Sequence, residues 1–593
     1  MAAENPIGLN IPERAPPERD ALVRPRDVED WLSELPMAGA VDTGARLLRA
    51  LNQINRTQLP AVTLIQIAEL FTRPALTAIQ GMERQFKDTG FPLSDKIRAM
   101  VDLCGGLHEA LATAYKIAAH DTALGRIGAP ERKVLVVSLT RAVAHFNDWI
   151  FYIVITYQRY PTQLWQEIHN LYQAGASNQV TTTQVKIFGG GTSEEGATLK
   201  ELYTRALLLA AASPNRLRQR EIAFMRTQLP GWARLVPLTE VQSPSTVPTR
   251  FYVPIFRDVP PVPSAFVKGG TTRAALELDT APLLGVLREL FEQLPADSDA
   301  IQPGGSQGEI SRAGVRRLIQ AWGSVPKREF ARTKLNFEMR IVVGLTKIHT
   351  LLNGDRDTGL ERPSVFITEA DPVGSESTLS LAPVPRGGSL DVESNLMLIP
   401  LEYEPASYMR SFISFGPSSQ HERPRGEPPS SFPLSRPTQP VERSGPSVFY
   451  TANESVGGYC VNWRGRRVPS VKIGELVGIQ SPSDAEQYRL AAVRRMTSTG
   501  PEELQVGLQV LAPSAVAASA VSLERAHELA QPILMVPEVK NANQPASLVA
   551  PMAAFKEGQR ILLKIDEKER PVRLTRLLEA TGAFARFLYE YYE

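Results

Sequence analysis

Six short β-prone runs are the feature that most constrains how this chain can fold. In the first, at residues 335–343, apolar Leu, Phe, Met, Ile and Val alternate with Asn, Glu and Arg. A period of two is typical of a β-strand with one buried face. The other runs follow closely, at residues 447–451, 459–463, 471–479, 488–496 and 504–511. Their lengths and spacing predict an antiparallel β-barrel.

Two polar motifs lie beside these strands and indicate a binding site. Arg328 and Arg332 form an R-x-x-x-R before the first strand, and Asn453, Ser455 and Gly458 form an N-x-S-x-x-G between the second and third. A guanidinium can bind phosphate oxygens or the O6/N7 edge of guanine through two bonds, and it can lie flat on a purine. The amide, the hydroxyl and the glycine add base contacts and close backbone approach. The set suits a flat, anionic, guanine-containing ligand.

In this order and strand context, the two motifs resemble the signature of PilZ domains, which are small bacterial β-barrels that bind cyclic di-GMP. The resemblance implies that Arg328 and Arg332 clamp phosphate and guanine. It also implies that Asn453 and Ser455 contact the other guanine edge, and that Gly458 holds the turn. Cyclic di-GMP is then a ligand, and no cofactor or metal is expected.

The resemblance covers about residues 325–352 and 447–512, a minority of the chain. Its main departure from the family is the wide separation of the two motifs. Residues 353–446 exceed any hairpin connection and are therefore expected to be an insertion, partly disordered because its second part is rich in Pro, Ser, Arg and Gly. Arg464 and the arginines after it either flank the ligand site or form a basic hairpin edge.

The length predicts several domains, because a single core does not grow to this size. The expected fold class is multidomain α+β, with an N-terminal all-α helical bundle or TPR-like region and a C-terminal PilZ-like antiparallel β-barrel. The expected parts are a flexible arm at 1–28, an α-helical domain at 29–235, a small mixed α+β segment at 236–325, the barrel at 326–352 plus 447–512, the insertion at 353–446, and a C-terminal helix and β extension at 513–593.

Two local signals outside the barrel predict helices. Thr192 to Glu195 fit a capping box that would open a helix over residues 199–212. Residues 514–530 follow a proline and are rich in alanine, so they are expected to form a helix after the barrel.

Composition excludes several function classes. The net charge of +2 gives no global attraction to nucleic acid or acidic membranes, and the two cysteines allow no disulfide framework. The most apolar window, residues 149–156, is too short to span a bilayer, and the N-terminus has no signal-peptide core. No nucleophile elbow, kinase set, dinucleotide fingerprint or metal-ligand spacing occurs, so an enzyme is not expected.

The favoured function is a cytoplasmic bacterial receptor that binds cyclic di-GMP through the barrel and passes the signal by contact with an unidentified protein. The alternative is a degenerate PilZ-like scaffold without ligand that acts as a structural or interaction protein through its helical domain. The long insertion, and Asn453 where Asp is commoner, motivate that alternative. Single-stranded nucleic-acid binding would need a basic groove with stacking aromatics, and the near-neutral charge argues against it. A homo-oligomer is left open.

Overall fold

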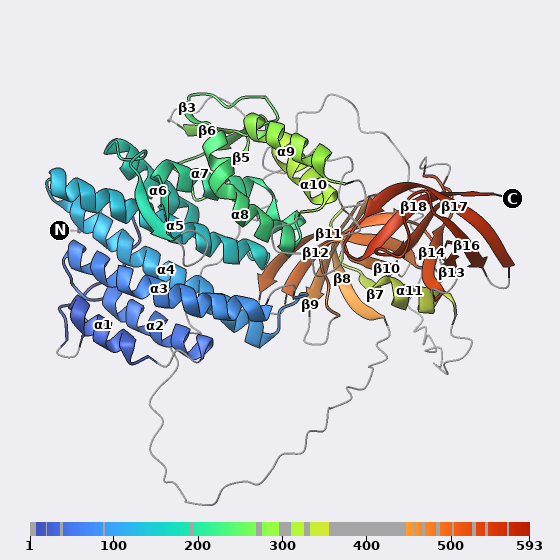
Figure 1. The fold of residues 1–593 in the computed structure, drawn as a ribbon, viewed down its shortest axis with the longest axis horizontal. Coiled ribbons are helices and arrows are strands. Elements are labelled where there is room, and N and C mark those ends of the chain that lie inside the picture. Colours follow the sequence, from blue (N-terminus) through green and yellow to red (C-terminus); the bar gives the residue numbers. More distant parts are fainter. Residues whose placement is uncertain are drawn as a thin grey trace, which may run out of the picture. The chain divides into compact units, whose positions relative to one another are not determined.

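The computed structural model describes most of the chain (Figure 1). Arg328 and Arg332 of the first motif lie outside the described residues, as does the expected insertion apart from its ends. The described residues are 7–18, 21–35, 39–86, 89–188, 194–267, 275–295, 310–324, 333–354, 446–455, 457–464, 469–481, 487–500, 503–524, 529–539, 544–565 and 568–592.

The N-terminal part is helical, as the sequence predicts. Its two longest helices pack side by side and are apolar over most of their circumference, because other helices cover them on several sides. The helices are α1 (Pro25–Ser33), α2 (Ala40–Asn55), α3 (Ala61–Phe86), α4 (Asp95–Leu124), α5 (Ala129–Ile155), α6 (Leu164–Ser177), α7 (Leu199–Ala211) and α8 (Gln219–Leu235).

Among the described residues, α3 is the one helix that is long and apolar enough to cross a membrane by length and composition. In the structure, 56% of its most apolar window is buried. Helices α2 and α4 pack against it, which is the environment of a core helix.

The prediction of a flexible arm is wrong for the described residues 7–18. Leu9 is buried, and Arg14 makes two hydrogen bonds to Asp121, at 2.6 and 2.7 Å. Lys116 donates both to the backbone oxygen of Asn10 and to the buried carboxylate of Glu167. These partners lie far away in sequence, so a Pro- and Arg-rich segment without periodicity gives no local sign of them.

The capping box expected at residues 192–195 is also wrong. Strands β1 (Val185–Phe188) and β2 (Glu194–Ala197) form a hairpin there. Helix α7 is capped instead by Thr198, whose hydroxyl accepts from the Glu201 N–H at 3.1 Å, while the Glu201 carboxylate accepts from the Thr198 N–H. Glu194 and Glu195 of the expected box lie in β2, so they cannot belong to the first turn of a helix.

A small mixed segment follows the helical domain. Its strands form one sheet in the order β3-β6-β4-β5, and Trp322 donates its indole N–H to the Leu208 carbonyl of the helical domain at 3.2 Å. The elements are β3 (Leu238–Val241), β4 (Arg250–Val253), β5 (Val262–Pro263), β6 (Ala275–Asp279), α9 (Ala281–Gln293) and α10 (Arg312–Gly323).

The predicted antiparallel barrel is confirmed. Its strands close in the order β10-β11-β12-β9-β8-β7, and inside it the rings of Phe449 and Trp463 stack with centroids 3.8 Å apart. We call it the first barrel. Its strands are β7 (Glu338–Val343), β8 (Ser447–Ser455), β9 (Gly458–Arg464), β10 (Leu476–Gln480), β11 (Arg489–Gly500) and β12 (Glu503–Ala512).

The C-terminal part forms a second closed barrel, in the order β13-β14-β15-β18-β17-β16. The helix expected over residues 514–530 is wrong, because residues 516–522 form β13. Ala518 and Ala520 fill the crowded barrel interior as small side chains, so tertiary packing overrides their helix propensity. The strands are β13 (Val516–Ser522), β14 (Gln531–Val536), β15 (Ser547–Pro551), β16 (Arg560–Ile565), β17 (Lys568–Ala580) and β18 (Phe584–Tyr591).

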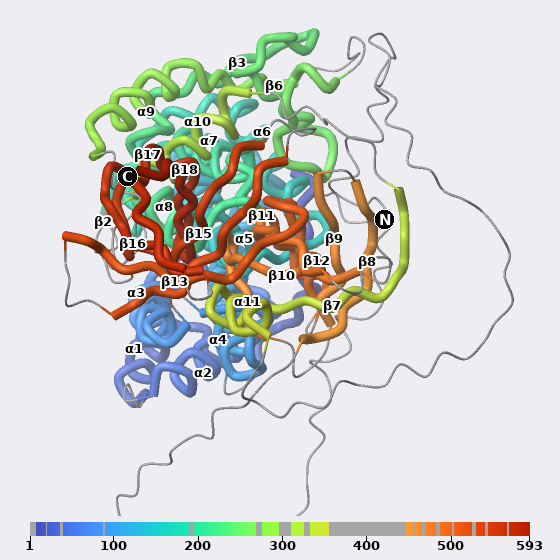
Figure 2. Tube along the Cα trace, turned by 90° about the vertical axis from the view of Figure 1, so that its right-hand side faces the viewer, coloured from blue at the N-terminus to red at the C-terminus, as the bar shows by residue number. Residues whose placement is uncertain are grey.

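Helix α11 (Leu345–Leu352) follows β7 and packs against both barrels, as Figure 2 shows beside β7 and β13. His349 contacts the carbonyl oxygen of Ala518 through Nε2 at 2.9 Å. Outward-facing side chains of both barrels share one hydrophobic cluster with this helix, including Leu476 and Leu490 from the first barrel and Phe584 from the second.

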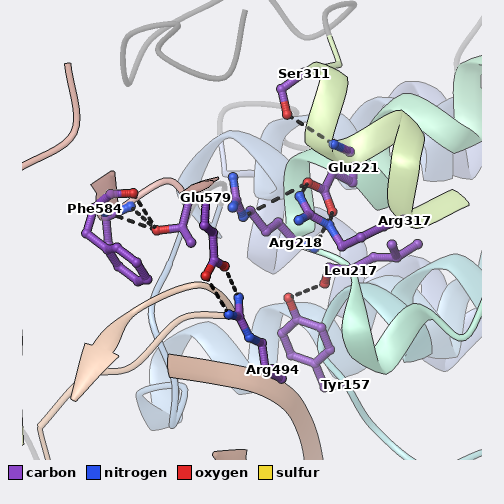
Figure 3. A network of polar contacts seen from close by, with 12 residues as sticks. Tyr157, Leu217, Arg218, Glu221, Ser311, Arg317, Arg494, Glu579 and Phe584 are labelled. Carbon is purple, nitrogen blue, oxygen red and sulfur yellow. Dashed lines mark hydrogen bonds and ion pairs between the residues drawn. The ribbon is translucent and has the colours of Figure 1, made fainter. Parts of the chain in front are cut away.

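Polar contacts join the helical domain to the mixed segment, and one barrel to the other (Figure 3). Glu221 of α8 is only 1% exposed, and it accepts hydrogen bonds from Arg317 of α10 and from the backbone N–H of Arg218. Arg494 of β11 makes two hydrogen bonds to Glu579 of β17, which links the barrels.

Backbone hydrogen bonds also tie the first barrel to the helical domain. Phe91 and Val471 exchange two N–H···O bonds of 3.0 and 2.9 Å. The Tyr157 carbonyl accepts from the Ser498 N–H at 2.7 Å, and the Tyr157 hydroxyl donates to the Leu217 carbonyl at 2.9 Å (Figure 3).

Candidate functional site

The second motif forms the tip of the β8–β9 hairpin. Asn453 pairs with Cys460, and Ser455 pairs with Gly458 across the tip, where the serine hydroxyl donates to the Gly458 carbonyl at 3.2 Å. A β-bulge between Thr451 and Asn453 sets this register. The motif is therefore a defined structural unit of the first barrel.

Gly458 is required by the close approach of β12. It has φ +155°, and a Cβ atom added to it would lie 2.0 Å from the carbonyl oxygen of Leu508. No side chain fits there without moving the strand. The close approach of β12 therefore explains why this position requires glycine.

The residue that follows the first motif pairs with a residue of the second. Thr333, the residue after Arg332 in the chain, exchanges two backbone hydrogen bonds with Glu454, at 2.9 and 3.0 Å. Glu454 stands between Asn453 and Ser455 in the second motif. Arg332 is therefore bonded to a residue that is fixed against the motif, although neither Arg328 nor Arg332 is among the described residues.

Strand alternation assigns the motif residues to faces of the barrel. Tyr459, Val461 and Trp463 are buried along the inward face of β9, so Cys460 and Asn462 face outward. Cross-strand partners share a face, which places Asn453, opposite Cys460, on the outward face of the hairpin.

A polar chain supports the hairpin from within. Arg489 of β11 donates to the Tyr459 hydroxyl at 2.8 Å. Burial raises the pKa of Tyr459 to about 12, Arg489 opposes the shift, and Glu454 adds to it. Tyr459 therefore stays a neutral hydroxyl at physiological pH and links β11 to the strand pair that carries the motif.

An open pocket of about 660 Å³ lies on the outward face beside the hairpin. Its walls come from the residues that follow the first motif, from those that precede the second, and from β9. They are Lys334, Leu335, Asn336, Tyr450, Thr451, Ala452, Asn462 and Arg464. The three described motif residues flank this pocket in sequence and do not line it.

The pocket chemistry matches a planar anionic ligand. Lys334 and Arg464 supply positive charge, and Asn336 and Asn462 supply amides that can both donate and accept. Tyr450 has a side chain on the barrel surface that is 50% exposed, so its ring is available for stacking on a base.

Sequence reasoning included Arg464 as a candidate but missed Lys334, Asn336, Tyr450 and Asn462. Tyr450 and Asn462 are directly opposed on β8 and β9. Extending the outward alternation from the motif along both strands would have identified them. The positions of Lys334 and Asn336 depend on how the chain runs beside β8, which short-range patterns do not reveal.

Two further features were candidates for reactive chemistry, namely metal-ligand clusters and a buried histidine pair. Among them, no group of three or more His, Cys, Asp or Glu is placed to hold a metal ion. His108 and His145 face each other inside the helical domain, with their Nδ1 atoms 3.3 Å apart. Burial lowers the pKa of both, that of His145 to about 3, so they are neutral packing groups at physiological pH.

Three family models match the chain in order. The model described as "Cyclic-di-GMP receptor FimW, N-terminal domain" matches residues 26–245, the middle PilZ domain of the same receptor matches 251–359 and 434–516, and the "FimW C-terminal beta-barrel domain" matches 516–592. The interruption of the middle match falls inside the expected insertion. Together the matches cover most of the chain.

A curated relative agrees with the family models. It is described as the cyclic-di-GMP receptor FimW from Pseudomonas aeruginosa (strain PAO1), and it is 25% identical over 574 residues, which are 95% of this chain and 90% of that protein. No solved structure matches.

The closed barrel with its hairpin motif, together with the middle match, defines the class: this is a PilZ-domain protein. Within that class the chain is similar to the cyclic di-GMP receptor FimW almost from end to end, because all three domain models follow one another along it and the curated relative matches 95% of it.

Proposed function

We propose that this protein is a receptor for cyclic di-GMP and that the ligand binds on the outward face of the β8–β9 hairpin. The observation that carries the proposal is the double hydrogen bond between Thr333 and Glu454, since Thr333 directly follows the R-x-x-x-R in the chain and Glu454 belongs to the N-x-S-x-x-G. The relative and two of the family models are described as cyclic di-GMP receptors, which supports the same ligand.

The proposed contacts divide between the motifs and the pocket. Arg328 and Arg332 clamp phosphate and guanine, because a guanidinium makes paired, charge-assisted hydrogen bonds to both. Asn453 and Ser455 contact the other guanine edge, and Gly458 keeps the hairpin tip against β12.

The pocket beside the hairpin extends this site. Tyr450 offers a stacking surface, while Lys334 and Arg464 balance the phosphate charge. This arrangement accommodates both an anionic backbone and flat bases, as the ligand requires.

The alternative of a degenerate scaffold is not favoured. All five motif residues are present in the sequence, and the Ser455–Gly458 tip is formed in the structure. Asn453 in place of Asp retains the acceptor oxygen and adds a donor. The insertion leaves the connection between Thr333 and Glu454 in place.

We propose a binding protein without enzymatic activity or cofactor that acts in the cytoplasm through another protein. The relative is named as a receptor. The chain has only two cysteines, Cys104 and Cys460, and such low cysteine usage fits a reducing compartment. Pull-downs with the full chain, with and without cyclic di-GMP, would identify the partner, and light scattering would establish the oligomeric state.

The first experiment is calorimetric titration of the full chain with cyclic di-GMP. Micromolar or tighter binding is expected for the wild type. Arg328→Ala/Arg332→Ala should weaken binding by about a hundredfold or more, because each lost charge-assisted hydrogen bond is worth roughly 1.5–3 kcal/mol.

The matched control is Arg560→Ala/Arg573→Ala, which removes two exposed arginines from the second barrel and should leave affinity unchanged. If the wild type gives neither heat nor a thermal shift at high ligand concentration, the proposal is wrong and the scaffold alternative stands.

A further inference from the structure

Arg464 has two roles on the surface of the first barrel. It is the last residue of β9 and it lines the ligand pocket. It also stands opposite Glu503, the first residue of β12, and its Nε lies 3.1 Å from a Glu503 carboxylate oxygen. One guanidinium is therefore within reach of both the pocket and a carboxylate at the end of the next strand.

Glu503 in turn lies where the first barrel touches the helical domain. A small cavity of about 20 Å³ is lined by Glu503 and Leu504 from β12 and by Phe91, Arg98 and Gln158 from the helical domain, among others. The Glu503 carboxylate is thus adjacent to a surface that joins two domains.

The end of β11 is held at this junction by specific bonds. Ser498 donates its N–H to the Tyr157 carbonyl, and its hydroxyl donates to the Gly500 carbonyl at 3.2 Å. Thr499 contacts a Glu503 carboxylate oxygen at 3.4 Å. A change at Glu503 therefore acts on the strand ends that carry the interdomain hydrogen bond.

A ligand phosphate can readily replace Glu503 as the partner of Arg464. Its side chains are 64% and 40% exposed, and exposed ion pairs contribute little to stability because water screens them. A phosphate can take a guanidinium through two parallel, charge-assisted bonds, so it competes effectively with a single exposed carboxylate.

We propose that Arg464 sets ligand affinity and is shared between the ligand and Glu503, so that an anionic ligand in the pocket draws Arg464 away from Glu503 and alters the contact of the adjoining ends of β11 and β12 with the helical domain. The proposal rests on the proposed function, because the ligand is taken to be cyclic di-GMP. It names the side chain through which binding is sensed outside the barrel. By thermodynamic linkage, any change that stabilises the state in which Glu503 is not paired with Arg464 also increases the affinity for the ligand.

The test is a double-mutant cycle on the full chain, titrated with cyclic di-GMP. Glu503→Gln removes the competitor and should tighten binding about threefold to tenfold, while Arg464→Gln should weaken it about tenfold. The double variant should bind like Arg464→Gln alone, because the competitor matters only when the guanidinium is present. Glu569→Gln is the matched control, since Glu569 is likewise an exposed glutamate that pairs with a cation, Lys564, in the second barrel, and the substitution should not change affinity.

Hydrogen exchange supplies the readout of the domain contact. Saturating ligand should change the exchange rates of the Ser498 and Val471 amides in the wild type, and should change them much less in Arg464→Gln. If Glu503→Gln binds no more tightly than the wild type, or if the two substitutions are additive, Arg464 is not shared. If the wild type itself binds no cyclic di-GMP, the proposed function is wrong. If the wild type binds cyclic di-GMP but the substitutions at Arg464 and Glu503 do not change affinity as expected, only the present inference is wrong.

Discussion

The two barrels have the same number of strands and the same closed, antiparallel order, yet their outer surfaces differ in use. Both interiors are filled by alternate residues of each strand, as closure requires. On the first barrel, the outer face of β10 and β11 is covered by α11 and the second barrel, while Val448 and Tyr450 on β8 remain about half exposed. The sequence of the second barrel contains neither of the two motifs.

The comparison shows how a barrel divides its residues between folding and binding. Inward positions are constrained by packing, so in both barrels they are occupied by apolar residues. Outward positions are free to form an interface, as Leu490 does, or a pocket wall, as Asn462 does. Fold alone therefore does not give function, and the pocket face has to be found residue by residue.

The largest expected effect comes from the interior of the first barrel. Trp463→Ala removes a fully buried ring that stacks on Phe449 and donates to the Pro469 carbonyl, and it should lower the free energy of unfolding by about 3–5 kcal/mol. Denaturant titration monitored by circular dichroism would measure it. Val448→Ala, on the outward face of β8, should cost well under about 1 kcal/mol. Equal losses would mean that the two faces do not differ.

Acid should lower the stability of the helical domain more than that of the barrels. Burial lowers the pKa of His145 to about 3 and that of His169 to about 4, and both lie in the helical domain. Their neutral forms are favoured in the folded state, so stability is complete above the unfolded pKa of about 6.5 and falls by about 1.4 kcal/mol per histidine for each pH unit below it.

Thermal unfolding between pH 7 and pH 5 would measure this loss, and His145→Gln should make the pH dependence shallower. A helical domain whose stability is unchanged at pH 5 would contradict the neutral assignment of these histidines.

The hairpin tip should be less tolerant of added volume than a nearby turn. Gly458→Ala places a methyl group against the Leu508 carbonyl and should cost about 1–3 kcal/mol, with weaker ligand binding because the motif moves. Gly500→Ala is the control, since its added Cβ would meet its nearest neighbour at 3.8 Å. Differential scanning calorimetry on both variants would measure the difference in stability. Equal melting temperatures would show that β12 moves to accommodate the added methyl group at little cost.

The smallest effect is expected at the link between the barrels. Arg494→Gln breaks the paired hydrogen bonds to Glu579 and should destabilise the protein by about 1 kcal/mol, because both side chains are part-exposed. Differential scanning calorimetry would measure the shift in melting temperature. Arg494→Gln should leave cyclic di-GMP affinity unchanged, unlike Arg464→Gln, and a clear loss of affinity would show that the covered face also contributes to the site.

Much of the first barrel could be predicted from the sequence, because its strands alternate or carry β-branched and aromatic residues. Strand β13 could not, since its Ala and Ser residues have no strand preference and only the barrel interior selects them. The fixed N-terminal segment was missed for a similar reason, as Arg14 finds Asp121 across the fold. Both failures concern contacts between residues that are distant in the chain.

The candidate site shows the same division. Asn453, Ser455 and Gly458 could be proposed from a short pattern, and the structure places them on one hairpin. Tyr450 and Asn462 carry no pattern of their own, and only the cross-strand register makes them neighbours. The junction through Arg464 and Glu503 depends on a third strand and on the helical domain, so it required the structure.

The position of β7 has a consequence for biosynthesis. This strand is the first of its barrel to leave the ribosome, yet both of its neighbours, β8 and β10, are encoded after residue 446. The helical domain can fold while synthesis continues, but both edges of β7 stay open until β8 emerges, and one of them stays open until β10 emerges. Such long-range closure is slow, and an unpaired strand is prone to aggregation. Nascent chains that end before β10 should therefore need chaperone protection that chains ending after α8 do not.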